Sequence, residues 1–252
     1  MAITIEQISD HIIWAEINRP EARNAIDFET INELEALVED IEQNDDIRLF
    51  VLSSAGRDIF VAGGDLKKFH TIKSEEKAIE MSGRVHTLFN RIEKLPCWTI
   101  ACINGDAYGG GVELMLCFDF RLAVPGVKFG FTQGRFYLTP GWGGLTRLVE
   151  KVGRTKALMW QGKAEIITAE EALKYQVIEE ILDGKDLREE VLQWAEKLIK
   201  NDRDFIQTLK QGASRFATGK RNALDAEIEP FAKLWVDEKH LARVEKFMNK
   251  KK

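Results

Sequence analysis

The feature that most constrains the fold is an alternation of continuous apolar runs with longer amphipathic segments. The runs at 49–52 and 98–103 have the length of a strand and almost no polar residue, which is typical of strands buried on both faces. Helical patterns at 27–41 and 75–94 precede these runs, and Asp27 is placed to cap the first helix. Shorter elements are expected at 112–117 (helix), 120–124 (strand) and 128–131 (strand). We therefore predict an α/β protein with short crossovers between its strands.

The two ends of the chain show different patterns. Residues 3–17 alternate apolar and polar positions with period two, which predicts a hairpin. From about residue 186 the pattern becomes helical, with helices predicted at 187–199 and 228–248. We expect this helical tail to pack on the body or on another subunit, because it has more large apolar side chains than a solvated helix requires. Those side chains are Phe205, Leu209, Phe216, Phe231, Leu234 and Trp235.

Composition and charge exclude several classes of protein. Of the 252 residues, 44% are hydrophobic and 31% are charged, which is the balance of an ordinary globular protein. The formal net charge is -5, and the only basic block is the terminal run of three lysines, so no nucleic-acid partner is expected. The longest apolar runs fall far short of the roughly 20 residues that cross a bilayer, and the N-terminus lacks the apolar region of a signal peptide. We therefore predict a cytoplasmic protein with no membrane partner.

The cysteines and histidines give no sign of a metal or nucleophile site. Cys97, Cys102 and Cys117 lie in apolar stretches and form no C-x-x-C pair, so they are predicted to be reduced packing residues. The four histidines have no metal-ligand spacing, and none lies beside Ser or Cys in a nucleophile motif. No metal site is predicted.

Two glycine-rich turns give the strongest indication of chemistry. Residues 60–66 (FVAGGDL) and 104–114 (NGDAYGGGVEL) each follow a predicted strand and open into a helix. Consecutive glycines let a ligand approach the backbone closely, and a helix start leaves N–H donors unpaired in a field that favours negative charge. Each turn alone is as consistent with tight packing as with function. Together they predict N–H groups that face one oxygen, and neither turn fits a nucleotide-binding template.

The order of motifs along the chain resembles that of the crotonase (enoyl-CoA hydratase/isomerase) superfamily over nearly the whole length. The motifs are NRP at 18–20, NA at 24–25, AGGDL at 62–66, GGG with EL at 109–114, DFRLA at 119–123, PGWGGLTRL at 140–148 and TAEEA at 168–172. The resemblance implies an α/β fold, a crotonase-like spiral of β-β-α repeats with a C-terminal helical region. Residues 1–190 would form the core with the acyl-CoA site, and residues 191–252 a helical trimerisation or lid region. Self-association as a homotrimer or a dimer of trimers is also implied.

The resemblance assigns roles to individual residues as well. The N–H groups of Gly64 and Gly110 would form the oxyanion hole for the thioester oxygen of an acyl-CoA substrate. No cofactor is implied beyond the coenzyme A moiety of that substrate. The path of this moiety would be lined by Arg23, Ala62, Asp65, Leu66 and Lys67. Of these, Arg23 and Lys67 also have an obvious interpretation as solvated surface charges.

The reaction is predicted from two positions. The family's hydratases use two glutamates; Glu113 matches the first, but Gln133 occupies the position of the second. Hydration needs a base for water and an acid for the α-carbon, and an amide cannot exchange a proton at neutral pH. Loss of CO2, in contrast, generates the enolate directly, so that the oxyanion hole supplies most of the stabilisation. We therefore predict decarboxylation of a methylmalonyl- or ethylmalonyl-type CoA, with Glu113 positioning the substrate or protonating the enolate.

Further features favour the same reaction, and two alternatives stay open. The segments 117–122 and 142–150 are similar to the ethylmalonyl-CoA/methylmalonyl-CoA decarboxylase branch. The acyl pocket is expected to be shaped by Phe69, Tyr137 and Trp142. The first alternative is an enoyl-CoA hydratase or isomerase of fatty-acid-type metabolism, in which Gln133 orients water. The second, a non-catalytic RNA-binding or assembly relative, is less favoured because the chain is acidic and retains both glycine turns.

Overall fold

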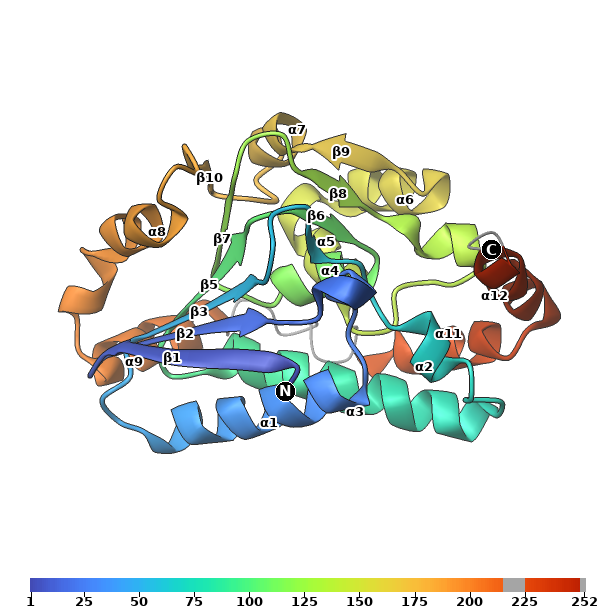
Figure 1. The fold of residues 1–252 in the computed structure, drawn as a ribbon, viewed down its shortest axis with the longest axis horizontal. Helices are drawn as coiled ribbons and strands as arrows, with labels where there is room; N and C mark the ends of the chain where they lie inside the picture. The colour runs from blue at the N-terminus through green and yellow to red at the C-terminus, as the bar shows by residue number, and fades with distance from the viewer. Residues whose placement is uncertain (215–224, 250–252) are drawn as a thin grey trace.

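Two β-sheets form the centre of the protein (Figure 1). The structure is a computed structural model that describes residues 1–214 and 225–249, and within these ranges the sheets have six and four strands. The first sheet, in spatial order, consists of β1 (Ile3–Ser9), β2 (Ile12–Ile17), β3 (Leu49–Ser54), β5 (Trp98–Ile103), β7 (Phe120–Ala123) and β10 (Glu180–Ile181). The second consists of β4 (Ile59–Val61), β6 (Asp106–Tyr108), β8 (Lys128–Gly130) and β9 (Ile166–Thr168).

Each of three strands in the first sheet is followed along the chain by a short strand of the second. β3 is followed by β4, β5 by β6 and β7 by β8, and helices complete each repeat. Successive repeats pair in parallel in both sheets, as at Val51 opposite Ile100 and Val61 opposite Ala107. The chain therefore winds as a spiral of β-β-α repeats, as predicted. The N-terminal hairpin is also confirmed, since β1 and β2 pair antiparallel.

Helices surround the spiral and extend into the C-terminal tail. Along the body they are α1 (Phe28–Gln43), α2 (Leu66–Phe69), α3 (Glu75–Lys94), α4 (Gly110–Met115), α5 (Gly144–Val152), α6 (Arg154–Lys163) and α7 (Ala169–Lys174). In the tail they are α8 (Leu187–Ala195), α9 (Arg203–Ser214), α11 (Ile228–Trp235) and α12 (Glu238–Asn249). Short 3-10 helices are η1 (Pro20–Ala22), η2 (Thr132–Phe136) and η3 (Leu198–Lys200). The predicted cap is confirmed: the Asp27 carboxylate accepts the N–H of Thr30 at 2.9 Å and begins α1.

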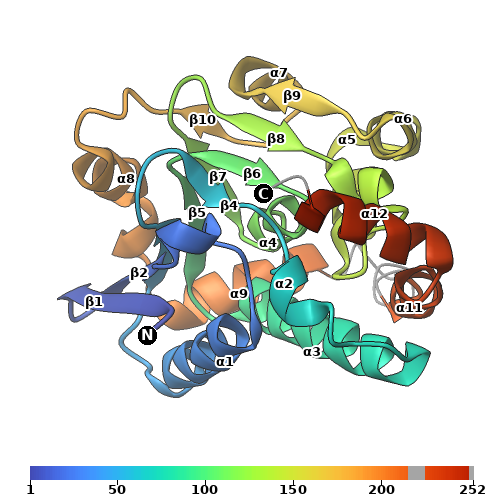
Figure 2. The same ribbon diagram turned by 45° about the vertical axis from the view of Figure 1, so that its right-hand side comes forward.

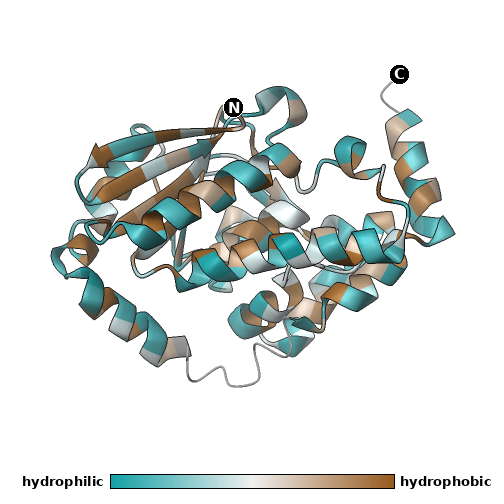
Figure 3. Ribbon diagram, turned by 90° about the horizontal axis from the view of Figure 1, so that it is seen from below, coloured by the Kyte–Doolittle hydropathy of each residue, from teal (hydrophilic) through white to brown (hydrophobic). Residues whose placement is uncertain are grey.

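The central strands β3 and β5 of the first sheet are buried on both faces, which explains the continuous apolar runs. Side chains alternate between the faces, so Phe50 and Leu52 join the main core with α1 and α3, while Val51 faces the other way. On that second face Val191 of α8 and Ile206 of α9 complete a smaller apolar cluster. Figure 2 shows α1 and α3 side by side beneath the sheets. Seen from below, these two helices carry many hydrophilic residues, whereas the strands behind them are largely hydrophobic (Figure 3).

The C-terminal pattern forms two helices where one was predicted. The helix predicted at 228–248 ends at Trp235, and α12 begins at Glu238. Asp237 accounts for the break, because its side chain accepts the N–H of Lys239 at 2.8 Å and so starts a new helix. The predicted pattern was apolar on one side throughout, and such periodicity does not reveal a local cap of this kind.

The predicted boundary between residues 190 and 191 falls within α8, which ends at Ala195, earlier than the predicted 199. The large apolar side chains of the tail then divide into two groups. Phe231 and Trp235 are buried against the main core, so packing on the body is confirmed for α11. The side chains of Phe205 and Leu209 on α9 are 53% and 50% exposed. Phe216 lies outside the described residues.

Candidate active site

The two glycine turns lie side by side because the strands before them are neighbours. β4 and β6 pair in parallel, so the residues that follow them leave the same edge of the second sheet. A Cβ atom built on Gly63 would lie 3.2 Å from the amide nitrogen of Gly110. The two turns predicted to act together are thus in direct contact.

The N–H groups of Gly64 and Gly110 have no hydrogen-bond acceptor among the described residues. On both sides of Gly64 the backbone is paired: the N–H of Ile26 donates to the carbonyl of Gly63, and the N–H of Asp65 donates to the carbonyl of Ile26, both at 2.8 Å. Gly110 is the first residue of α4, a position whose N–H has no partner within the helix. Two free donors on adjoining turns are what an oxyanion hole requires. That role for these two amides stays a prediction.

The indole ring of Trp142 packs against both glycines. A Cβ atom on Gly110 would lie 2.1 Å from the ring, and one on Gly64 would lie 3.2 Å from it. On another side the ring meets Phe89 edge-on, with centroids 5.8 Å apart. The indole N–H is buried and has no partner in the described part of the chain. Trp142 is thus brought to the glycine turns, as expected of a pocket residue.

Glu113 is buried beside these turns and bound by three N–H donors. One carboxylate oxygen accepts the backbone N–H groups of Trp142 and Gly144 at 2.8 and 3.0 Å, and the other accepts the side-chain amide of Gln133 at 3.1 Å. Burial raises the pKa of Glu113 to about 7; the negative charge of Glu227 adds to the rise, and the three hydrogen bonds oppose it. A carboxyl group with this pKa is suited both to take and to give a proton near neutral pH.

Gln133 lies in η2 with its side chain buried next to Glu113. Its amide nitrogen donates to the carboxylate, but its side-chain oxygen is buried without a partner in the described ranges. Leaving such an atom unpaired costs about 1–3 kcal/mol, and in a native protein it marks a place for water or ligand. The site therefore has one free acceptor, from Gln133, next to the carboxyl group.

The residues predicted to line the coenzyme A path lie on two segments that the fold joins. The N–H of Ala62 donates to the carbonyl of Arg23 at 3.2 Å, which places the segment 62–67 beside the segment that contains Arg23. The side chains of Arg23 and Lys67 are exposed, and those of Ala62 and Leu66 are half-buried. These four residues therefore lie near Gly64, and their contact with coenzyme A stays a prediction.

Asp65 differs from its neighbours because its carboxylate is held within the protein. It accepts the N–H groups of Lys67 and Lys68 at 3.1 and 3.3 Å, which starts α2, and it pairs with Arg19 at 2.9 Å. Arg19 also pairs with Asp27 at 3.0 Å. This network ties the loop before α1 to the first glycine turn. The side chain of Asp65 thus supports the turn, and its role in binding coenzyme A stays untested.

The two other predicted pocket residues lie in different surroundings. Phe69 is buried under the first glycine turn, where a Cβ atom on Gly64 would lie 3.0 Å from its ring. Tyr137, at the end of η2, is half-buried, and its ring contacts Lys239 and Arg243 of α12, with charges 4.9 and 5.2 Å from the ring centre. The fold thus brings Phe69 to the turn, while Tyr137 packs against the C-terminal helix.

Glu227 joins the site although no sequence motif marks it. Its carboxylate accepts the N–H groups of Leu145 and Thr146, in the first turn of α5, at 3.2 and 2.6 Å. Burial raises its pKa, and these hydrogen bonds lower it. In the sequence Glu227 is one of several glutamates of a helical tail, so its burial could not be read from local pattern.

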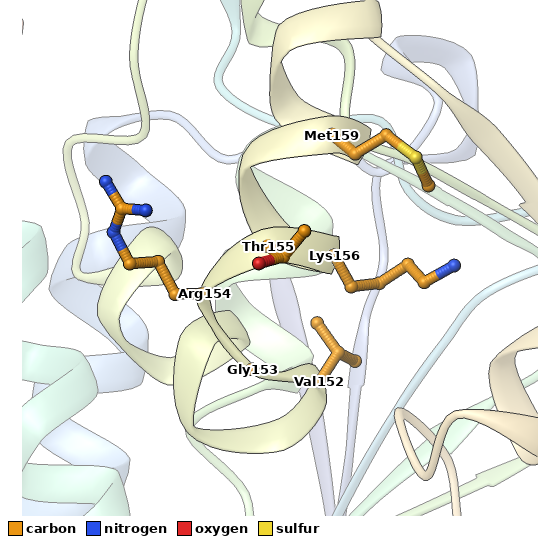
Figure 4. A pocket seen from close by; sticks show the side chains of 6 residues that line it. All are labelled: Val152, Gly153, Arg154, Thr155, Lys156 and Met159. Carbon is orange, nitrogen blue, oxygen red and sulfur yellow. The ribbon is translucent and has the colours of Figure 1, made fainter.

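A hollow on the surface lies where α5 meets α6 (Figure 4) and contains none of the predicted site residues. It is lined by Val152, Gly153, Arg154, Thr155, Lys156 and Met159. The three cysteines are buried free thiols, as predicted, and burial raises the pKa of each to about 12.

Metal and membrane sites were also sought in the part of the chain that the structure describes. There, no group of three or more His, Cys, Asp and Glu side chains is arranged to hold a metal ion. No helix in the same ranges combines the length and apolar character needed to span a bilayer.

Comparisons with known proteins find relatives that match along nearly the whole chain. Residues 7–252 match the family described as Enoyl-CoA hydratase/isomerase. The chain is 31% identical over 240 residues to the Short-chain-enoyl-CoA hydratase of Clostridium acetobutylicum, covering 94% of this chain and 90% of that protein. It is 29% identical to the Crotonyl-CoA hydratase of Syntrophomonas wolfei, covering 94% and 91%. A solved enoyl-CoA hydratase from Bacillus anthracis superposes with a TM-score of 0.82 at 27% identity, covering 99% of this chain and 97% of that one.

These relatives overturn the predicted reaction and confirm the superfamily and its fold. The two relatives described above are named as hydratases, so the prediction of malonyl-type decarboxylation is wrong, and the decarboxylase-like branch gains no support. The prediction treated a single carboxyl group as insufficient for hydration. A carboxyl group with a pKa of about 7, however, can act as base and acid in turn. On the match over residues 7–252 and the 31% identity to a member, the chain belongs to the enoyl-CoA hydratase/isomerase family.

Proposed function

We propose that this protein is an enoyl-CoA hydratase for short-chain substrates, which adds water across the double bond next to the thioester. The observation behind the proposal is the buried Glu113 carboxyl group, with a pKa of about 7, beside two glycine turns with free N–H groups. The names of two relatives, at 31% and 29% identity, support the same reaction.

In the proposed reaction the N–H groups of Gly64 and Gly110 bind the carbonyl oxygen of the thioester. As water adds to the β-carbon, the electrons of the double bond move toward that oxygen and an enolate forms. Two aligned donors stabilise this charge, and removing one such donor typically lowers the rate by about 10²–10³-fold. The Trp142 ring, packed on both glycines, limits the space open to solvent at this point.

Glu113 performs both proton transfers in this scheme. Its carboxylate takes a proton from the attacking water as the water oxygen bonds to the β-carbon. The resulting carboxylic acid gives that proton to the α-carbon, and the enolate returns to the thioester. Protons and electrons therefore balance with one carboxyl group, which ends the cycle as a carboxylate ready for the next substrate.

The proposed role of Gln133 is to orient the attacking water. Its amide nitrogen donates a hydrogen bond to the Glu113 carboxylate at 3.1 Å, and its unpaired oxygen is available to accept a hydrogen bond from water. An amide does this without exchanging a proton. Gln133 was the basis for predicting against hydration, and in the scheme proposed here it positions the attacking water.

Mass spectrometry of products from crotonyl-CoA, methylmalonyl-CoA and ethylmalonyl-CoA tests the proposal. We expect crotonyl-CoA to gain one water and the other two to lose no CO2. The Glu113→Gln variant should hydrate about 10²-fold more slowly or worse. The matched control is Glu170→Gln, at an exposed glutamate of α7, which should keep the original rate. Failure of the unmodified protein to hydrate crotonyl-CoA, or full activity in Glu113→Gln, contradicts the proposal.

A further inference from the structure

The N-terminus of α5 binds two carboxylates at once. Glu113 accepts the N–H groups of Trp142 and Gly144 at 2.8 and 3.0 Å. Glu227 accepts the N–H groups of Leu145 and Thr146, the next two along the chain, at 3.2 and 2.6 Å. The donors that begin this helix are therefore divided between the reacting carboxyl group and a second one that the reaction does not use.

The two carboxylates reach α5 from different parts of the chain. Glu113 projects from α4, inside the spiral, and Glu227 immediately precedes α11 in the tail. Gly144 allows the close approach of Glu113, since a Cβ atom there would lie 2.3 Å from the Glu113 Cγ. Glu113 is 4% exposed and Glu227 is 8% exposed, so water screens neither charge effectively.

Two negative charges at one helix end increase each other's affinity for protons. The helix N-terminus stabilises each carboxylate, but the presence of one charge opposes the formation of the other. For Glu113, burial raises the pKa to about 7 and the charge of Glu227 adds to the rise. For Glu227, burial raises the pKa, whereas its hydrogen bonds and the charge of Arg147 lower it. Arg147 thus favours the charged form of Glu227.

The other charged groups on the helices near this pair largely cancel or are neutral. Arg147 of α5 forms an ion pair with Glu93 of α3 at 2.9 Å. His86 of α3 has a lowered pKa because of burial and the charge of Arg147, so it is neutral at pH 7 and above. Asp225, which precedes α11, is 60% exposed and lies 3.9 Å from His86. This leaves Glu227 as the charge that acts on the reacting carboxyl group.

The remaining elements packed against Glu113 add little charge at this point. β4 consists of apolar residues, and in β6 the Tyr108 hydroxyl donates to Asp106 at 2.6 Å. In η2, Gln133 is uncharged, and the exposed Arg135 donates to the carbonyl of Ala164 at 3.1 Å. The electrostatic coupling therefore runs mainly between the two glutamates.

We propose that Glu227 is a positioning residue for the reaction: it holds the first turn of α5 against Glu113 and keeps that carboxylate basic enough to accept a proton from water. The inference rests on the hydratase function proposed above. Without a charge at position 227 the helix end would stabilise Glu113 alone, and the carboxylate would be a weaker base.

The Glu227→Gln variant tests this inference, because it keeps the size and one acceptor oxygen but removes the charge. Glutamate labelled with ¹³C at its carboxyl carbon allows NMR to follow the titration of Glu113 without substrate. The signal of Glu113 is identified as the one that is absent from the spectrum of Glu113→Gln. We expect the titration midpoint of Glu113 to fall by about one pH unit in Glu227→Gln. The control is Glu229→Gln, at an exposed position of the same helix, and it should leave the midpoint unchanged.

Kinetics on crotonyl-CoA supply a second measurement. The acidic limb of the kcat/KM profile should move to lower pH in Glu227→Gln, by the same amount as the NMR midpoint. The rate on the plateau should fall by about 3–10-fold, because a weaker base takes the proton of water less readily. A profile that keeps its position would overturn the inference.

A purely structural role for Glu227 predicts a different outcome. The Glu227→Asp variant keeps the charge but withdraws it by one methylene, so we expect the titration midpoint of Glu113 to fall less than in Glu227→Gln. If the Glu227→Gln protein does not fold, the Glu227→Asp variant is used for the test. If Glu227 only braced α5, both variants would lower Tm and leave the midpoint in place, which overturns the inference. Failure of the hydratase proposal would appear instead as an unmodified protein that is inactive yet shows the midpoint shift in its variants.

Discussion

The burial of Glu113 destabilises the fold, and the proposed chemistry explains why the residue is there. Its pKa rises from 4.5 to about 7 because burial disfavours the charged form. The folded protein therefore binds this proton more tightly than the unfolded chain, and the free energy of unfolding falls as pH rises from about 4.5 to about 7. At about 1.4 kcal/mol per pKa unit, the penalty above pH 7 is on the order of 3 kcal/mol. Such trade-offs between stability and activity are common in active sites.

Replacing this glutamate by glutamine should stabilise the protein while it abolishes most of the proposed hydration activity. At pH 8 we expect Glu113→Gln to gain about 1–3 kcal/mol of unfolding free energy and a Tm higher by a few degrees, because the neutral side chain avoids the burial of a charge. The new oxygen still accepts from Trp142 and Gly144, and a turn of the Gln133 amide, which now donates to Glu113, brings its free oxygen to the new amide nitrogen.

Thermal unfolding at pH 8 and pH 5 checks this expectation. At pH 5 the folded protein already holds Glu113 protonated, so the gain in Tm should be much smaller there than at pH 8. An equal gain at both pH values would show that relief of a buried charge is not the cause, and a loss at both would contradict the prediction outright.

Helix α4 shows how close packing restricts the sequence of an element. A Cβ atom on Gly110 would overlap the Trp142 ring at 2.1 Å, and one on Gly111 would lie 2.2 Å from the carbonyl oxygen of Val61 in β4. Only residues without side chains allow the start of the helix to lie this close to both neighbours. The same closeness brings the free N–H of Gly110 next to the turn that contains Gly64.

Two glycine-to-alanine variants on different helices should have opposite effects. Gly110→Ala should lose about 1–3 kcal/mol from overpacking and about 10²-fold or more in hydration rate, because Trp142 and the amide must both shift. Gly83→Ala, within α3, meets nothing within 4 Å and should gain about 0.4–1 kcal/mol without a change in rate. Urea unfolding and a crotonyl-CoA assay measure both effects. A Gly110→Ala protein of unchanged stability and rate would refute the proposed packing.

One segment on the surface of the molecule leaves several apolar side chains uncovered. The segment α6–β9–α7, together in the upper part of Figure 1, presents several that are between 36% and 45% exposed. They are Leu158, Met159, Ile166 and Leu173. Several exposed apolar groups in one segment are typical of an interaction surface. They support the predicted self-association as a trimer or a dimer of trimers, which stays a prediction.

Light scattering after size exclusion should give a mass that is a multiple of three chains of 28.7 kDa. Leu158→Glu combined with Leu173→Glu should shift the protein to smaller species, because each change places a charge on the apolar face. Lys163→Gln, at an exposed position of α6, alters charge by the same amount as one of these changes and should keep the mass of the parent. A parent protein that stays monomeric at micromolar concentration would contradict the prediction.

Local patterns were sufficient for the long elements of the fold. The bounds of α3 and β5 agree with their predicted ranges, because periodicity, caps and a following proline act over a few neighbouring residues. The short strands β4, β6, β9 and β10 were not predicted, since two or three residues are too few for a period and form strands only when partners lie beside them. Local patterns also drew attention to the two glycine turns, whereas the roles of Gly64, Gly110 and Glu113 were implied by the resemblance to the superfamily.

The chemistry of that site depended on contacts between distant parts of the chain. Whether Glu113 can act as both base and acid is a matter of its desolvation and of the charge on Glu227, and neither is visible in a motif. Both arise because α4, α5 and the start of α11 meet at one point, bringing together groups widely separated in sequence. A reaction inferred from residue types alone was therefore wrong, since electrostatic interactions depend on distances in space rather than positions along the chain.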